Sequence, residues 1–435
     1  MIRRTRLRKV FAGTQGLRKA TLAGLGGLLC LILGVSLSFK LVILPYLETV
    51  EELAGRFLRS IVPPDNLDVA THMLGGALLF LGLFLIVKAV RFAVYAIVST
   101  ITGVKENFAD IYFRRLQLAQ GPRIVALGGG TGLSTLLRGL KQHSSNITAI
   151  VTVTDDGGSS GRLIQDKGMI PPGDIRNCLV ALADAEKAMT DLFQHRFKDD
   201  SGSLSGHSIG NLLIAALVDQ NRGDFEQAIA RASDVLLIRG RVVPSTLAHV
   251  RLKAVLEDES ELWGETKIAG AGKRIRRIFL DPEVVEAYAP AIEAIRNADL
   301  ICVGPGSVFT SVIPNLLVPE ITEALRASEA PKVYICNVMT QPGESDSFTA
   351  SEHVTAIRAN VPGRIFDYVM VNTGTPSPTA IEKYKGSGQF LVEPDIDRIK
   401  AMGFRVLPGD LMSETDVVRH DPMRLAAKLI ALRDW

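Results

Sequence analysis

Two long runs of apolar residues dominate the first third of the chain. Residues 20–39 contain no acidic residue, lysine or arginine, and neither do residues 69–87. A helix of about 20 apolar residues is long enough to cross the ~30 Å hydrocarbon core of a bilayer. The pattern therefore predicts two membrane-spanning helices joined by a connector.

Charged residues around these runs predict how the helices are oriented. Residues 1–19 contain seven lysines and arginines and no acidic residue, and Lys88 and Arg91 follow the second run. The connector is acidic on balance, with Glu48, Glu51, Glu52, Asp65 and Asp68. Because positive residues concentrate on the cytoplasmic side, both ends of this hairpin are expected in the cytoplasm. A cleaved signal peptide fits less well, since the second run would remain and no small-residue cleavage site stands out.

The pattern changes after residue 104. Residues 105–120 are charged with a helical spacing, and Gly121 and Pro122 end this segment. From residue 122 onward, short apolar runs alternate with amphipathic segments. The runs predicted as strands of one sheet are 123–127, 147–154, 298–303, 332–338 and 367–371, with helices at 175–185, 210–218, 224–231 and 422–433. Strands of a less regular insertion are expected at 250–256 and 274–280.

This alternation predicts a Rossmann-like, doubly wound α/β fold with a mostly parallel sheet. The predicted domains are a membrane hairpin over residues 1–104, a helical connector over 105–121 and the α/β domain over 122–435.

The net charge and the cysteine content bear on which class of protein this is. The formal net charge of +3 over 435 residues does not indicate a protein that binds nucleic acid, which usually shows a basic patch. The four cysteines lie far apart in apolar runs without a C-x-x-C pair, at Cys30, Cys178, Cys302 and Cys336. They are expected to be buried, reduced thiols in a cytosolic compartment rather than a metal or disulfide set.

Two glycine-rich turns follow predicted strands. Gly128–Gly132 comes directly after residues 123–127, and Gly304–Ser307 follows residues 298–303. Glycine lets backbone N–H groups approach an anion, and the N-terminus of a following helix adds a partial positive charge. The two turns at the carboxyl edge of one sheet predict a ligand with more than one polar group. Leu133 replaces the third glycine of G-x-G-x-x-G, which disfavours a simple NAD(P)-dependent oxidoreductase.

Gly206, Ser208 and Gly210 match the G-x-S-x-G pattern of a hydrolase nucleophile elbow. That geometry requires a buried strand leading into the serine, whereas the preceding sequence KDDSGSLSG is polar and broken by glycine. The sequence therefore predicts a loop that enters a helix, with Asn211 in its first turn, and not a serine hydrolase.

Several long motifs together resemble one family. They are GGGTGLS at 128–134, DDGGSSGRL at 155–163, PPGDIRNCLVALAD at 171–184, GHSIGNLL at 206–213, GPGSVFTSVIPNLL at 304–317, CNVMTQPGES at 336–345 and VVRHDP at 417–422. This part of the chain resembles the CofD-like superfamily, and the spellings DDGGSSGRL and PPGDIRN are similar to its YvcK-type gluconeogenesis-factor branch. The resemblance covers residues 122–435 and leaves out residues 1–120.

The resemblance implies a fold that binds nucleotide-containing ligands. The YvcK-type branch is associated with UDP-sugar binding, growth on gluconeogenic carbon sources, cell shape and control of cell-wall synthesis. The leading hypothesis is a membrane-anchored UDP-sugar sensor, expected as a homo-oligomer, that acts through regulatory proteins of envelope synthesis. The alternative is a transferase that moves a 2-phospholactyl group from a nucleoside diphosphate carrier to a deazaflavin with the help of Mg²⁺.

The resemblance also implies the residues of the site. Backbone amides would meet a diphosphate at Gly128, Gly129, Gly130, Thr131, Gly132, Gly304, Gly306 and Ser307. Asp155 and Asp156 point to opposite sides of an extended segment, so one would serve the ligand, or Mg²⁺ in a transferase, and the other the loop. Asp174 either caps the following helix or contacts the ligand. Further ligand contacts are expected from Arg176, Asn177, Asn211, Asn337, Tyr384 and Arg419, with a solvated position as the alternative for Asn211, Asn337 and Arg419.

Overall fold

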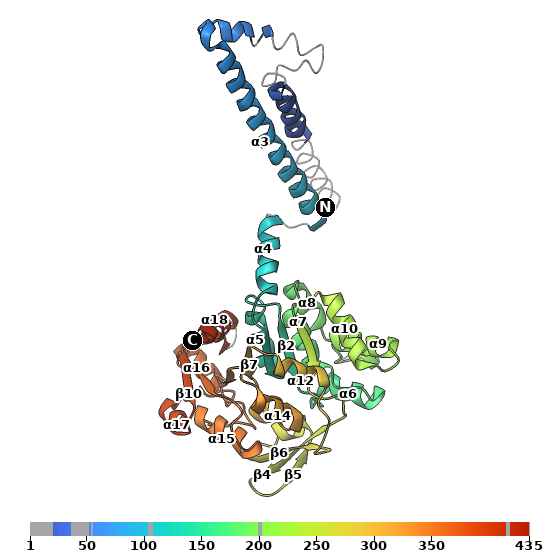
Figure 1. The fold of residues 1–435 in the computed structure, drawn as a ribbon. Helices are drawn as coiled ribbons and strands as arrows, with labels where there is room; N and C mark the ends of the chain where they lie inside the picture. The colour runs from blue at the N-terminus through green and yellow to red at the C-terminus, as the bar shows by residue number, and fades with distance from the viewer. Residues whose placement is uncertain are drawn as a thin grey trace. The chain divides into compact units, whose positions relative to one another are not determined.

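The computed structural model describes residues 21–35, 52–53, 55–102, 108–198, 202–414 and 418–434. The chain forms two compact units, Met1–Leu116 and Gln117–Trp435. The division falls within helix α4 (Phe108–Ala119), which lies in the predicted connector (Figure 1).

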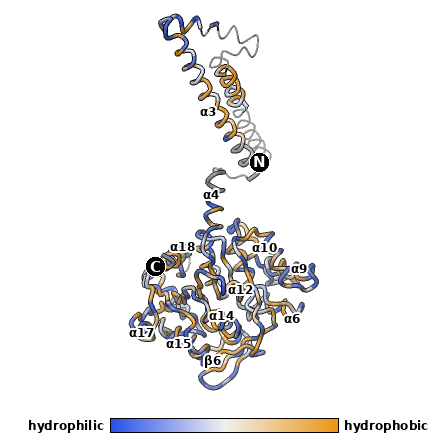
Figure 2. The backbone as a smooth tube through the Cα atoms, in the orientation of Figure 1, coloured by the Kyte–Doolittle hydropathy of each residue, from blue (hydrophilic) through white to orange (hydrophobic). Residues whose placement is uncertain are grey.

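The N-terminal unit contains two apolar helices. Thr21–Val35 forms the shorter one, and the longer one, α3 (Leu67–Thr102), follows the 3-10 turn η1 (Pro64–Asn66). Hydrophobic residues occupy much of both helices (Figure 2). Within Pro64–Ala93, an 18-residue window has a mean hydropathy of 2.3, so this helix is by length and composition able to cross a membrane; it includes the predicted span 69–87. Residues 20 and 36–39 of the other predicted span lie outside the described residues.

Glycines bring the two helices of this unit into close contact. A Cβ atom on Gly27 would lie 2.9 Å from the carbonyl oxygen of Gly82, and one on Gly82 would lie 2.8 Å from the backbone nitrogen of Leu31. Gly24 faces Ala89: a Cβ atom on Gly24 would lie 3.6 Å from the Cβ atom of Ala89. The residue numbers run in opposite directions, so the helices are antiparallel. Small residues at the crossing are typical of helix pairs in membranes, where close backbone packing drives association.

Within the described residues, a seven-stranded parallel sheet forms the centre of the C-terminal unit. Its strands lie in the order β10-β9-β8-β7-β1-β2-β3. They are β1 (Ile124–Gly128), β2 (Ile147–Val151), β3 (Arg241–Pro244), β7 (Leu300–Val303), β8 (Lys332–Ile335), β9 (Tyr368–Asn372) and β10 (Arg405–Gly409). The chain leaves β1 toward β2 and β3 and returns on the other side of β1 as β7. The predicted Rossmann-like fold is confirmed, although the strand predicted at 147–154 ends at Val151 and the two edge strands β3 and β10 were not predicted.

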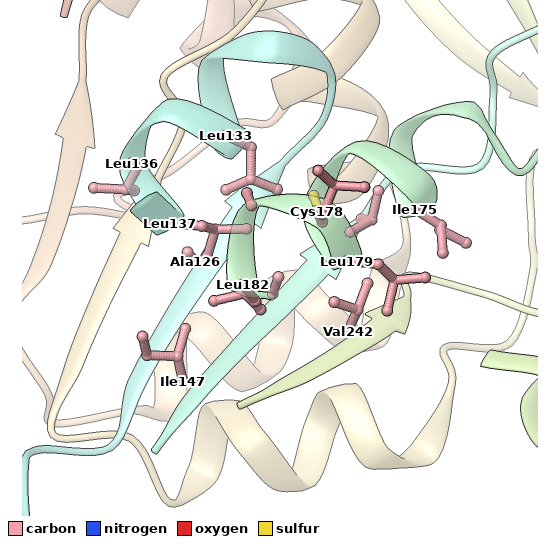
Figure 3. Close-up of a cluster of buried hydrophobic side chains, with 14 of the residues drawn as sticks. Ala126, Leu133, Leu136, Leu137, Ile147, Ile175, Cys178, Leu179, Leu182 and Val242 are labelled. Carbon is pink, nitrogen blue, oxygen red and sulfur yellow. The ribbon is translucent and has the colours of Figure 1, made fainter. Parts of the chain in front are cut away.

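Successive side chains of the strands enter opposite halves of the core. In β1, Ile124 and Ala126 belong to one apolar cluster, whereas Val125 and Leu127 belong to the other, as the period of two in a strand requires. The first cluster includes side chains of α5 (Gly130–Leu140), α7 (Gly173–Leu182), α9 (Ile209–Gln220), α10 (Phe225–Leu236) and α18 (Pro422–Ile430); Figure 3 shows part of it. The second includes α12 (Ala289–Arg296), the π-helical turn η3 (Val308–Val312), α13 (Ile313–Leu316), α14 (Pro319–Ala327), α15 (Ala350–Asn360) and α17 (Ile396–Ala401).

Two smaller antiparallel sheets complete this unit. β4 (Arg251–Leu256), β5 (Glu261–Trp263) and β6 (Ile275–Asp281) pair in the order β5-β4-β6, and the short helix α11 (Glu265–Ala269) lies between β5 and β6 in sequence. This sheet is the predicted insertion. β11 (Met412–Glu414) and β12 (Val418–His420) form a two-stranded sheet just before α18. The remaining helices of eight residues or more are α6 (Gly158–Lys167), α8 (Glu186–Phe193) and α16 (Pro378–Lys385).

Candidate functional site

The two glycine turns meet where the strand order of the sheet reverses. One turn follows β1 and the other follows β7, and these strands are neighbours. In open α/β sheets, ligands bind outside the carboxyl ends of the strands at such a switch point. A cavity of about 590 Å³ lies there, which is within the roughly 300–1,000 Å³ range of small-molecule sites.

The cavity brings together many of the residues predicted from sequence. It is lined by Gly129, Gly130, Thr131, Gly132, Asp174, Gly306, Ser307, Asn337, Tyr384 and Arg419. Gly128 and Gly304, at the ends of β1 and β7, are not among the lining residues. Lining residues that sequence reasoning missed include Glu265, Ser311, Gln341 and Gln389. Ser311 and Gln341 lie inside motifs of the family, whereas Glu265 and Gln389 carried no signal.

The first turn has a shape that requires glycine. Gly130 has a φ of +62°, in the left-handed region that favours glycine. A Cβ atom on Gly129 would lie 2.5 Å from a carboxylate oxygen of Asp174, and one on Gly132 would lie 2.5 Å from the carbonyl oxygen of Pro305 in the second turn. The two turns are therefore in backbone contact. The first leads directly into α5, whose first N–H groups lack partners within the helix and are suited to an anion.

Asn337 holds the second turn in place. Its Oδ1 accepts a hydrogen bond from the backbone N–H of Gly306 at 3.0 Å, and its Nδ2 donates to the carbonyl oxygen of Gly306 at 2.9 Å. Asn337 follows β8, the neighbour of β7, and so lies next to this turn. Sequence reasoning expected this side chain to contact a base or sugar, but the structure uses both of its polar groups to fix the turn.

One rim of the cavity comes from the C-terminal part of the chain. The hydroxyl oxygen of Tyr384 in α16 accepts a hydrogen bond from the backbone N–H of Val418 at 2.7 Å, which joins α16 to β12. Arg419 of β12 is exposed and lines the cavity. The adjacent His420 is buried, with its Nε2 3.0 Å from the carbonyl oxygen of Cys336, and burial lowers its pKa to about 4. Among the described lining residues, Arg419 therefore supplies the permanent positive charge.

Carboxyl groups with raised pKa values border the same cavity. Asp174 accepts a hydrogen bond from the backbone of Gly130; burial, and next the negative charge of Asp155, raise its pKa to about 7. Burial also raises the pKa of Glu265 to about 9, and the charges of Asp174 and Asp155 add to this shift. Outside the lining of this cavity, burial also raises the pKa of Glu344, which accepts a hydrogen bond from the hydroxyl of Thr310, to about 7. At neutral pH a bound anion would thus meet Glu265 as a neutral acid.

Asp155 and Asp156 do not line the cavity. Asp156 accepts hydrogen bonds from the backbone N–H and the hydroxyl of Thr266, both at 3.0 Å, and thereby fixes the start of α11. Asp155 accepts from the backbone N–H of Gly157 at 3.0 Å. The helix-capping alternative for Asp174 is wrong, because the N-cap position of α7 is Pro172 and no side chain caps it.

Arg176, Asn177 and Asn211 lie in a hydrogen-bond network outside the cavity. Arg176 is buried, and its Nη1 donates to Ser208 Oγ at 2.6 Å and to Asn211 Oδ1 at 2.9 Å. Its Nη2 donates to Asn177 Oδ1 at 2.9 Å, and Asn211 Nδ2 donates to Ser159 Oγ at 3.1 Å. The expectation that these three side chains line the ligand cleft is corrected: they tie α6, α7 and α9 together.

Ser208 is the N-cap of α9. Its side chain is fully buried, and its Oγ accepts from the backbone N–H of Asn211 at 3.2 Å as well as from Arg176. In the part of the chain that the structure describes, the residues before it include the 3-10 turn η2 (Gly202–Leu204), and Ser208 makes an isolated bridge with Arg196, but no strand leads into it. The nucleophile-elbow geometry is absent from this loop.

We expect Ser208→Ala to destabilise the fold by about 1–3 kcal/mol, because a helix cap is lost and a buried guanidinium loses a partner. Denaturant unfolding of residues 117–435 measures this change. Ser233→Ala, which removes a hydroxyl bonded within α10, is the control, with an expected change within about 0.5 kcal/mol. A fluorophosphonate probe should leave Ser208 unmodified, and stoichiometric labelling that disappears in Ser208→Ala would contradict this assignment.

The described residues contain no group of three or more His, Cys, Asp or Glu arranged to hold a metal ion. The four cysteines are free; Cys178, Cys302 and Cys336 are buried, as predicted, whereas Cys30 is half-buried. Burial raises the pKa of the Cys302 and Cys336 thiols to about 12, so these thiols stay protonated and unreactive at neutral pH.

Comparison with known proteins identifies the family. The family model described as "2-phospho-L-lactate transferase CofD" matches residues 124–412. The "Gluconeogenesis factor" of Bacillus subtilis (strain 168) is 47% identical over 72% of this chain and 99% of its own length. The "Putative gluconeogenesis factor" of Nostoc sp. (strain PCC 7120) is 44% identical over 95% of this chain and 90% of its own. A crystal structure of a UPF0052-family protein from Bacillus halodurans matches with a TM-score of 0.67 and 45% identity, over 71% of this chain and 99% of that chain.

With its parallel sheet and paired glycine turns, the chain belongs to the CofD family, and its curated relatives include gluconeogenesis factors from several bacteria. The resemblance seen in the sequence motifs is confirmed. The relatives differ in extent: the match to the Bacillus subtilis protein has about the length of the C-terminal unit, whereas the match to the Nostoc protein covers 95% of this chain and so extends into the N-terminal unit. Because the crystallised relative matches this chain over 71% of its length and is itself almost wholly covered, residues 117–435 are expected to fold alone.

Proposed function

We propose that this protein is a membrane-anchored, cytoplasmic regulator that binds a UDP-sugar and acts in the control of cell shape and cell-wall synthesis. The observation that carries the proposal is the meeting of two glycine turns at the switch point of the sheet. Their backbone N–H groups, with the N-terminus of α5, suit a diphosphate. The name of these relatives, gluconeogenesis factor, describes a role in metabolism and does not specify a catalysed reaction.

The remainder of the cavity fits a nucleotide sugar. Arg419 adds a positive charge for a phosphate or a uracil carbonyl, and the ring of Tyr384 offers a surface for stacking. Glu265 and Asp174 lie close to the first glycine turn, where hydroxyl-rich groups find acceptors and, in the protonated state, donors. One ligand with a base, a diphosphate and a sugar would use all of these groups.

Membrane anchoring is supported by the N-terminal unit. The stretch Pro64–Ala93 contains the uncharged apolar run 69–87, and Gly82 of this run contacts Gly27 of helix Thr21–Val35. The basic residues 3–19 precede the shorter helix, and the start of that helix lies beside Ala89, close to Lys88 and Arg91. In sequence, positive residues thus flank the outer ends of both apolar runs, which favours a two-span hairpin with these ends in the cytoplasm.

The transferase remains a second candidate, because the matching family model is named for 2-phospho-L-lactate transferase. Mg²⁺ would support this reaction by neutralising phosphate charge, and Mg²⁺ is usually held by one or two carboxylates together with substrate phosphates. Asp155 or Asp156 would hold it; each carboxylate already accepts a hydrogen bond through one oxygen, from Gly157 and from Thr266 respectively.

Ligand binding separates the two candidates. UDP-N-acetylglucosamine is expected to raise the melting temperature of residues 117–435, because a ligand that binds only the folded state stabilises it. Arg419→Ala should weaken this binding about tenfold, which corresponds to ~1.4 kcal/mol, whereas Lys428→Ala on the exposed face of α18 should not. Calorimetry measures both. Stabilisation by a deazaflavin and not by the UDP-sugar would favour the transferase instead.

Membrane topology is tested by cysteine labelling of the full chain in a Cys30→Ser background. Glu52→Cys lies in the connector and Lys105→Cys follows the second apolar run. A membrane-impermeant maleimide added from outside should label Glu52→Cys, and Lys105→Cys only after the membrane is opened. Labelling of both positions from the same side would contradict the two-span hairpin.

A further inference from the structure

The connector enters the C-terminal unit at the edge of the central sheet where the parallel strands begin. Leu118, near the end of α4, is buried, and its carbonyl oxygen accepts a hydrogen bond from the backbone N–H of Ser145, shortly before β2. The side-chain amide of Asn146 donates to the carbonyl oxygens of Ala119 and Gly121, both at 2.8 Å. Because neighbouring strands of this sheet are parallel, their amino ends share one edge, here named the amino edge.

Basic residues concentrate at the amino edge. This edge comprises the link into each strand with the last turn of the helix before it, and the link between α7 and α8. Its residues are 120–124, 137–147, 183–185, 233–241, 293–300, 324–332, 357–368 and 398–405. They include 13 lysines and arginines and six acidic residues, whereas residues 117–435 as a whole contain 34 and 39, a net charge of −5. The amino edge is therefore a positive surface on a negative unit.

The opposite, carboxyl edge of the sheet holds the ligand cavity and has the reverse charge. It comprises the segments that follow the strands, each with the first turn of the next helix where one follows directly. Its residues are 129–133, 152–161, 245–250, 304–311, 336–353, 373–381 and 410–425, with two arginines and nine acidic residues. The insertion, residues 251–288, is nearly neutral, with seven basic and eight acidic residues. A unit with this polarity turns its amino edge toward a negative surface.

Most of the basic side chains at the amino edge reach solvent. The exposed ones are Arg123, Arg241, Arg296, Arg326, Arg358, Arg364, Arg398, Lys400 and Arg405. Basic residues also stabilise the C-terminal ends of helices, and the buried Lys141 and Lys332 do so here, because their ammonium groups donate to carbonyl oxygens after α7 and α14. Arg123 pairs with Asp299 and Arg364 with Asp367, whereas Arg241 and Arg405 make no ion pair within the described residues.

Two exposed apolar side chains lie at the same edge. Val235, in the last turn of α10, is 67% exposed, and Leu237, just after this helix, is 69% exposed. Arg239 and Arg241 follow them in the link to β3. Apolar side chains among cations are typical of surfaces that bind anionic membranes, because the cations attract the headgroups and the apolar groups enter the interface.

We propose that the amino edge docks the C-terminal unit on the anionic cytoplasmic surface of the bilayer, with the carboxyl edge and its ligand cavity directed away from the lipid. This inference rests on the membrane anchoring of the proposed function. Residues 103–107 reach at most about 20 Å when extended, and the 12 residues of α4 about 18 Å. The connector therefore keeps the amino edge near the bilayer, and this high local concentration makes a weak attraction sufficient.

Vesicle flotation of residues 117–435 tests the surface without the anchor. At low ionic strength the fragment should float with vesicles of equal parts phosphatidylcholine and phosphatidylglycerol and not with phosphatidylcholine alone, and high salt should release it. The triple variant Arg241→Gln, Arg296→Gln, Arg405→Gln should bind about tenfold more weakly or worse. The matched control, Lys198→Gln, Arg274→Gln, Lys385→Gln, removes three exposed cations outside the amino edge and should bind close to the parent. Circular dichroism confirms the fold of each variant.

A fluorescent label then tests which edge meets the lipid. The native cysteines of this fragment are buried, so a nitrobenzoxadiazole label can be attached at Leu237→Cys. Its emission should rise and shift to shorter wavelength on the anionic vesicles. The same label at Val284→Cys should not respond, because Val284 is 80% exposed in the segment that leads from β6 to α12, on the side where α12 begins.

Two results would overturn the proposal: equal flotation of the two triple variants, or equal responses of the two labels. Binding of the fragment to a DNA duplex without flotation would also overturn it and assign the cations to nucleic acid. Each of these results leaves the two-span hairpin standing, because the maleimide labelling of the full chain tests that topology separately.

Discussion

Replacing Gly132 by alanine is expected to abolish UDP-sugar binding. The new Cβ atom would lie 2.5 Å from the carbonyl oxygen of Pro305 and 2.8 Å from its carbonyl carbon, so the two glycine turns would have to separate. The backbone of the second turn is not easily displaced, because Asn337 makes two hydrogen bonds with Gly306. If both turns supply N–H groups to one diphosphate, we expect affinity to fall at least about 100-fold, or ~2.8 kcal/mol.

The matched control is Gly128→Ala, one strand residue before the same turn. There a Cβ atom would meet only ordinary contacts, with Leu133 Cβ at 3.6 Å as the nearest. Calorimetry with UDP-N-acetylglucosamine on residues 117–435 should find binding close to that of the parent, and circular dichroism should find both variants folded. A folded Gly132→Ala protein that binds like the parent would show that the two turns do not form one site.

The second large effect concerns the pH dependence of stability. The pKa of Glu265 is raised from 4.5 to about 9 by burial and by neighbouring carboxylates. Between these values the folded state holds a proton that the unfolded state releases, so stability falls as pH rises through this window. The upper limit of the slope from one group is about 1.4 kcal/mol per pH unit. Glu265 is partly exposed at the cavity, which screens the effect and makes the expected slope smaller.

Glu265→Gln should therefore flatten the decline in stability of residues 117–435 between pH 5 and pH 8.5, with the largest gain over the parent at the alkaline end. Urea unfolding at a series of pH values measures it. The control is Glu283→Gln at an exposed position, which should leave the parent's slope unchanged. A parent protein whose stability is flat or rises over this range would show that Glu265 is ionised in the fold.

Local sequence determined the units of the fold. A buried strand, a glycine turn and an amphipathic helix follow one another within residues 123–140, and each is specified by neighbours in the chain. The same holds for the apolar runs of the N-terminal unit. The loop before α9 could be predicted because the residues before Ser208 are unable to form a strand, whereas the structure identified Ser208 as the helix cap. The edge strands β3 and β10 are as long as the central strands, but each contains a proline and β10 has a half-exposed pattern, so both resemble loops in sequence.

Which residues the site residues contact depends on which strands are neighbours in the sheet. The sheet places β7 beside β1 although about 170 residues separate them, and only this pairing brings Pro305 against Gly132. Asn337 and Arg176 have polar groups that suit a ligand, but packing gives them Gly306 and Ser208 as partners. Glu265 reaches the cavity because Asp156 fixes α11 from a distant strand end. Residue types and local periodicity determine the helices and strands. The ligand site forms where helices and strands that are distant in sequence come together. Which of them come together is decided by the burial of both faces of the sheet.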